Sequence, residues 1–156
     1  MKTEIIAPSF FDFESDFVES LRCIPMIVRY KLDSCGIKLK LPEWVKISVE
    51  EKTQLAFLPC YLDCEIERYG QFVKELVWKY ASQEASLLSD INDSWNDIHE
   101  IPQEVKRTAA EWNCKIPTLK QWIDLDTLQR FALVKLSRSG HEGKNFPRAM
   151  REFGLM

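Results

Sequence analysis

The stretches WVKISVEEKTQLAFL at residues 44–58 and WIDLDTLQRFALVKL at residues 122–136 decide the fold of this chain. They carry similar residues in the same order, and the step from position 44 to position 122 is 78 residues. The same step separates every matching pair along the two stretches. Such self-similarity indicates two copies of one helical unit. It predicts an architecture and specifies no reaction.

Both stretches contain a signal for the start of a helix. Ser48 and Asp126 each stand three residues before a glutamate or a glutamine, which is the pattern of a capping box. We therefore expect helices over about 49–58 and 127–137. The second helix is apolar on nearly all sides, so we expect it to be central and buried.

A further helix precedes each of these stretches. Pro25 suits the first position of one helix and Gly36 its end, while Pro102 and Asn113 do the same in the second copy. Between the copies, a long helix is predicted near 61–81, because apolar residues recur there at steps of four and three. That apolar stripe could belong to the core or to a dimer interface.

These signals together predict an all-α protein. We expect a single compact helical domain over residues 1–156, built from two pseudo-repeated helix–turn–helix units at about 24–58 and 102–137 plus the long helix near 61–81. Residues 83–101 are the least periodic part and are rich in Asp, Asn and Ser. They are therefore expected to form a long surface connection.

Composition narrows the class of protein. The 156 residues are 46% hydrophobic, as in a globular domain, and the formal net charge of −3 gives no general attraction to nucleic acid or to an anionic membrane. We expect neither a signal peptide nor a membrane span. The five cysteines are scattered and odd in number, so we expect reduced thiols in a cytoplasmic protein. The oligomeric state stays open.

The segment 129–146 has the highest density of polar functional groups. Its candidates for binding a ligand or a partner are Arg130, Lys135, Arg138, His141 and Asn145. A guanidinium fork with loop amides could hold a phosphate. Alternatively, Lys135 and Arg138 could complement the negative C-terminus of their helix. His141 could be a general base, a ligand or a surface histidine.

Other candidates lie outside that segment. Arg29 could share a pocket with Arg130, or it could pair with an acid on its own helix. Cys60 and Cys64 are four residues apart and could supply half of a metal site, although small buried residues are the simpler interpretation. The acids at 90, 93 and 97 lack the glycine and terminal glutamate of a calcium loop. No common enzyme motif is present, so we predict no catalytic residue.

Four passages resemble a known family. They are SLRCIPMIVRYKLDSCGIKLKL at residues 20–41, LPC at 58–60, QRFALVKLSRSGHEGKNF at 129–146 and EFGL at 152–155. Together they resemble the nitrate reductase-associated protein family, which is found mostly in cyanobacteria. The resemblance implies an accessory factor needed for active assimilatory nitrate reductase, a cytoplasmic enzyme with a molybdopterin guanine dinucleotide and an iron–sulfur cluster. It provides no catalytic residues to carry over.

The resemblance supports one leading hypothesis and leaves two alternatives. The leading hypothesis is a maturation factor, a small chaperone that binds apo-nitrate reductase or helps to load molybdopterin guanine dinucleotide while holding it transiently. The basic candidates Arg29, Arg130, Lys135, Arg138 and His141 would suit the phosphates of that cofactor. One alternative is a small enzyme acting on a pterin or a related anion, with Cys60 as nucleophile. The other is a regulatory protein that senses a small anion.

Overall fold

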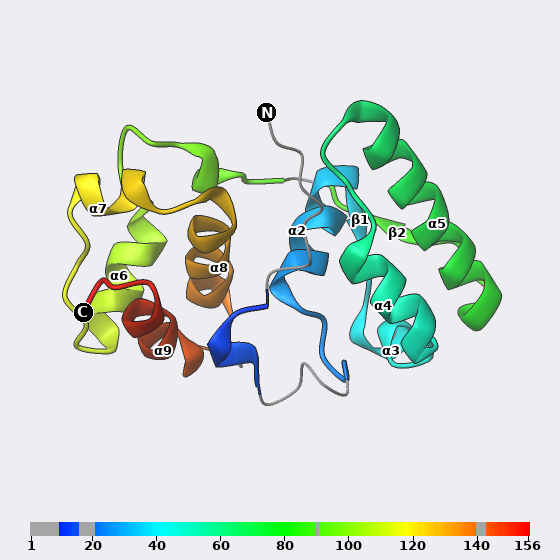
Figure 1. Ribbon diagram of the computed structural model, residues 1–156, viewed down its shortest axis with the longest axis horizontal. Helices are drawn as coiled ribbons and strands as arrows, with labels where there is room; N and C mark the ends of the chain where they lie inside the picture. Colours follow the sequence, from blue (N-terminus) through cyan, green and yellow to red (C-terminus); the bar gives the residue numbers. More distant parts are fainter. Residues whose placement is uncertain (1–9, 16–20, 90, 140–142) are drawn as a thin grey trace. The chain divides into compact units, whose positions relative to one another are not determined.

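The computed structural model describes residues 10–15, 21–89, 91–139 and 143–156. The chain falls into two compact units (Figure 1). The first comprises residues up to Ile91 except Phe11–Phe13, and the second comprises Phe11–Phe13 together with Asn92–Met156. Most of the described residues are helical, so the predicted all-α class is confirmed. The single domain stays a prediction.

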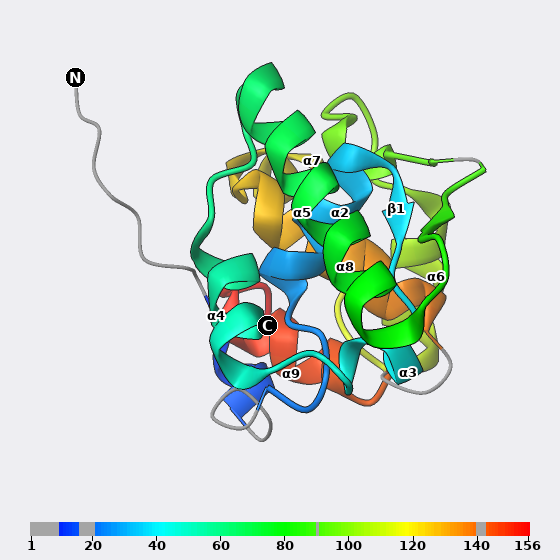
Figure 2. The same cartoon turned by 90° about the vertical axis from the view of Figure 1, so that its right-hand side faces the viewer.

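The first unit is built around one long helix. Its elements are α2 (Met26–Cys35), β1 (Ile37–Lys38), α3 (Leu41–Trp44), α4 (Val49–Phe57), α5 (Asp63–Ala81) and β2 (Ser86–Leu87), after the short 3-10 helix η1 (Asp12–Glu14), which spans the unit boundary. Helix α5 packs on α2 and α3, and α2 also contacts α4 (Figure 2). The two short strands pair antiparallel, with Ile37 opposite Leu87.

The second unit surrounds a buried helix. Its elements are η2 (Ser94–Asn96), α6 (Gln103–Glu111), α7 (Leu119–Asp124), α8 (Thr127–Arg138) and α9 (Asn145–Glu152). Helix α8 contacts η2, α6 and α9. The four consecutive side chains from Phe131 to Val134 are fully buried, which confirms the central position predicted for this helix.

The two units contain corresponding helices at nearly the same step along the chain. Helices α3 and α7 begin at 41 and 119, and α4 and α8 begin at 49 and 127, a step of 78 residues in both cases. Helices α2 and α6 begin at 26 and 103, one residue less. Gly36 and Asn113 both adopt the left-handed backbone that ends a helix, with φ of 72° and 56°. The predicted helix stops are therefore confirmed.

The predicted helix starts are also confirmed. The Ser48 hydroxyl accepts a hydrogen bond from the Glu51 N–H at 3.1 Å, and the Asp126 carboxylate accepts one from the Gln129 N–H at 2.8 Å. Each unit buries one tryptophan completely before these caps, Trp44 in the first and Trp122 in the second. Both indoles satisfy their N–H on a main-chain carbonyl, those of residues 21 and 97.

Each unit also buries a cation at the corresponding position. Lys52 in α4 is 6% exposed, and its ammonium lies 5.2 Å from the centroid of the Trp44 ring. Arg130 in α8, 78 residues later, is 8% exposed. A long cationic side chain against aromatic or main-chain groups is thus a common feature of both copies.

Two sequence predictions need correction in detail. Residues 83–101 were predicted to be a surface connection, which is wrong at Trp95, because its ring is 3% exposed and packs edge-on against Phe131. The apolar stripe of α5 is buried at Tyr69, Val73 and Leu76, whereas its first predicted member, Leu62, is 63% exposed. No helix among the described residues is long and apolar enough to cross a membrane.

Candidate functional site

Three of the predicted site residues gather around Trp95 in the second unit. Helix η2 places this indole against α8, with its ring centroid 4.8 Å from that of Phe131. Arg130, Lys135 and Arg138 of α8 all approach Trp95, through its carbonyl in the first case and its ring in the other two. We call this set the Trp95 cluster. Sequence analysis overlooked Trp95 because its neighbours are turn-forming residues.

Arg130 lies at the buried end of the Trp95 cluster. Its Nε donates to the Trp95 carbonyl at 2.8 Å, and its other donors reach Thr127 Oγ1 and the carbonyls of Trp122, Ile123 and Leu125. These acceptors belong to η2 and to the turn between α7 and α8. The guanidinium therefore joins three elements, and its donors point at main-chain oxygens rather than at a ligand.

Lys135 and Arg138 form the outer part of the Trp95 cluster. The Lys135 ammonium lies 5.7 Å from the Trp95 ring centroid and 5.3 Å from that of Phe131, within the range of a cation–π contact. Arg138 Nε pairs with the Glu104 carboxylate of α6 at 2.6 Å. Both residues stand in the last turn of α8, where positive charge favours the helix.

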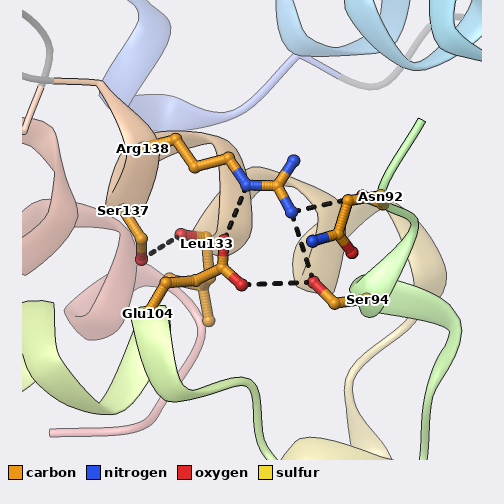
Figure 3. Close-up of polar contacts among 6 residues, drawn as sticks. All are labelled: Asn92, Ser94, Glu104, Leu133, Ser137 and Arg138. Carbon is orange, nitrogen blue, oxygen red and sulfur yellow. Dashed lines mark hydrogen bonds and ion pairs between the residues drawn. The ribbon is translucent and has the colours of Figure 1, made fainter. Parts of the chain in front are cut away.

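Figure 3 shows how Arg138 is held. One terminal nitrogen donates to the Asn92 carbonyl at 3.2 Å and to the Ser94 hydroxyl at 3.4 Å, while Glu104 faces the other side of the group. The Ser94 hydroxyl and the other Glu104 oxygen are 3.5 Å apart. Because the guanidinium already has a carboxylate and two oxygen partners, the arrangement ties α6, α8 and residues 92–94 together.

The remaining basic and polar candidates lie elsewhere. Arg29 belongs to α2 of the first unit, and its Nε donates to the Ile24 carbonyl at 3.1 Å. Asn145 begins α9 and accepts a hydrogen bond from Arg148 at 3.1 Å. His141 lies outside the described residues. The convergence of all these groups on one anion therefore stays a prediction.

A surface pocket lies beside Arg148 on α9. It has a volume of about 340 Å³ and is lined by Asp12, Phe13, Arg148, Arg151 and Glu152. The Glu152 carboxylate accepts the backbone N–H groups of Asp12 and Phe13 at 3.0 and 3.1 Å, which fixes this N-terminal segment on α9. Two arginines and two acids give the lining no excess charge, so it does not favour an anion.

The two candidate metal ligands differ in environment. Cys60 is 1% exposed and its Sγ lies 3.7 Å from the Lys31 carbonyl, whereas Cys64 is exposed. Burial raises the pKa of the Cys60 thiol to about 12, so it is protonated at neutral pH. Among the residues that the structure describes, no three His, Cys, Asp or Glu side chains are grouped to hold a metal ion.

Comparison with known proteins adds one finding. No curated protein and no solved structure matches the sequence. A family model described as conserved nitrate reductase-associated protein matches residues 10–153, which is nearly the whole chain and includes the Trp95 cluster and both helical repeats. The chain therefore belongs to the conserved nitrate reductase-associated protein family.

Proposed function

We propose that this protein is an accessory factor that binds nitrate reductase during the maturation of that enzyme in the cytoplasm. The observation that carries the proposal is the family match over residues 10–153, because the family description names an association with nitrate reductase. In this proposal the protein recognises the apo-enzyme and keeps it able to accept its molybdopterin guanine dinucleotide.

The chemistry of the candidate residues supports binding in preference to catalysis. The enzyme alternative needs an accessible thiolate at Cys60, and that thiol is buried with a pKa raised to about 12. In the Trp95 cluster, Arg130 and Arg138 direct their donors at carbonyls, at a hydroxyl and at Glu104. These groups serve to hold helices in place, which suits a rigid binding protein.

The test combines a binding measurement with a deletion strain. Purified protein immobilised on a surface should retain nitrate reductase that lacks its cofactor more strongly than the loaded enzyme. A strain without this protein should contain nitrate reductase polypeptide with a reduced content of molybdenum and low activity. Normal cofactor content in that strain, together with no retention of the apo-enzyme, would refute the proposal.

A calorimetric control separates the anion-sensing alternative. Titrations with nitrate, nitrite, molybdate and phosphate should give no saturable heat if the protein acts by binding the enzyme. Saturable binding of one anion, with no effect of the deletion on cofactor content, would favour a sensor.

A further inference from the structure

The junction between α4 and α5 exposes four large apolar side chains in a run of six residues. Phe57 is 53% exposed, Leu58 37%, Tyr61 60% and Leu62 63%. We call these four side chains the α4–α5 apolar patch. Single exposed apolar residues are common on protein surfaces, but a contiguous group is typical of a binding site.

The first half of this junction is fixed by a buried lysine. Lys31 of α2 is 3% exposed, and its ammonium donates to the Ala56 and Leu58 carbonyls at 2.7 and 2.6 Å. These carbonyls belong to the end of α4, where the helix leaves acceptors without partners. Tyr69 of α5 donates its hydroxyl to the Leu55 carbonyl at 2.7 Å. The end of α4 is thus held from two helices.

The second half is fixed by a buried thiol and a helix cap. Cys60 points inward and is 1% exposed. One carboxylate oxygen of Glu65 accepts the N–H groups of Tyr61 and Leu62 at 3.1 and 2.9 Å, which caps the start of α5. With the backbone anchored on both sides, Tyr61 and Leu62 are held in outward positions. A patch fixed in this way loses little conformational entropy on binding.

The charge around the patch indicates the chemistry of its partner. From residue 53 to residue 67 every charged side chain is acidic, namely Asp63, Glu65 and Glu67. The basic residue before this stretch, Lys52, is buried, and the one after it, Arg68, lowers the pKa of Glu65 by its charge. An apolar patch with an acidic border complements an apolar segment flanked by lysine or arginine.

We propose that the α4–α5 apolar patch docks an apolar segment of nitrate reductase that is flanked by basic residues. This inference rests on the proposed function and names the surface that performs it. Tyr61 is the central anchor, because tyrosine combines a large apolar ring with a polar end and is enriched among residues that dominate binding energy. The acidic border orients the segment and accelerates the encounter.

The first test measures the dissociation constant of the full-length protein with apo-nitrate reductase. The double variant Tyr61→Ser with Leu62→Ser should weaken binding about 30-fold, as expected for loss of central interface residues. The matched control is Trp78→Ser, because Trp78 lies on the same helix and is 62% exposed. It stands 16 residues after Leu62, about 24 Å along the helix axis. The control should bind within twofold of wild type.

The second test examines the acidic border. Glu67→Lys should weaken binding about 3- to 10-fold at low salt, and the difference from wild type should shrink as salt is added. Glu75→Lys, an equally exposed change further along α5, is the control and should have little effect. Circular dichroism and thermal unfolding of every variant establish that the fold is retained.

The possible outcomes distinguish the two levels of the proposal. If wild-type protein does not bind the apo-enzyme, the proposed function fails. If wild type binds and the Tyr61/Leu62 double variant binds within twofold of it, the docking surface is wrong while the function stands. Tighter binding by Glu67→Lys would overturn the basic partner segment. A wild-type dimer that becomes monomeric in the double variant would show that a second copy of the chain occupies the patch.

Discussion

Replacing Arg130 by alanine tests the interpretation of the Trp95 cluster as a structural unit. The substitution removes two short hydrogen bonds from a charged donor, one to the Trp95 carbonyl and one to the Leu125 carbonyl, both in buried surroundings. A buried acceptor left without its donor costs about 1–3 kcal/mol. The three contacts of 3.4–3.5 Å add little, because they exceed ordinary hydrogen-bond distances.

These contributions give an expected loss of about 3–5 kcal/mol in the free energy of unfolding. That is a large part of the roughly 5–15 kcal/mol that stabilises a typical domain. The assay is urea unfolding followed by tryptophan fluorescence. With a slope of about 2 kcal/mol per molar urea, the midpoint should fall by about 2 M. Arg107→Ala, an exposed change on α6, is the control and should stay within about 0.5 kcal/mol of wild type.

The result for Arg130→Ala also decides between structure and ligand binding. If Arg130 served an anion site, its removal would relieve an unfavourable buried charge and leave stability nearly unchanged or increased. A loss below about 1 kcal/mol, with wild-type protein stabilised by phosphate, would therefore refute the structural interpretation.

Three further measurements follow from the same structure. Hydrogen bonds from its neighbours lower the pKa of Glu51 to about 2, so its contribution to stability, about 1–2 kcal/mol, should be present above pH 4.5 and disappear as the pH falls toward 2. The variant Glu51→Gln should lack this pH dependence. With an alkylating reagent at pH 8, Cys64 should react quickly and Cys60 only on unfolding, as read by mass spectrometry. Glu152→Ala should accelerate amide hydrogen exchange at Phe13, because it removes the acceptor of that N–H.

Each of these experiments has a defined contrary result. Equal acid sensitivity of wild type and Glu51→Gln would show that the carboxylate interactions do not contribute. Alkylation of Cys60 at the rate of Cys64 would show that the α4–α5 junction opens readily. Unchanged exchange at Phe13 would mean that other contacts fix the N-terminal segment on α9.

Local signals in the sequence predicted the scaffold well because they act over a few residues. The caps at Ser48 and Asp126 and the left-handed stops at Gly36 and Asn113 depend on neighbouring backbone groups. The buried tryptophan of each unit was marked by its place in the repeat. These features recur in both copies, and recurrence distinguishes scaffold from chance.

The prediction of the site was weaker because burial depends on contacts between distant residues. Trp95 stands in a polar stretch, and its burial follows from α8, more than 30 residues later. Arg130 was interpreted as an anion ligand, although Lys52 occupies the same place in the first copy. A cation repeated in both copies indicates a structural role. The exposure of Tyr61 and Leu62 was hidden, because their sequence continues an apolar helical stripe.

The attachment of Phe11–Phe13 to α9 has a consequence for synthesis of the chain. The residues that the Glu152 carboxylate bonds are separated from it by 139 and 140 positions. At about 5–20 residues per second, the ribosome needs roughly 7–28 seconds to translate the intervening chain. During that time the aromatic rings at 11 and 13 have no α9 to cover them. The second unit can therefore close only after translation has passed its last helix, which makes this segment a target for chaperones that act on nascent chains.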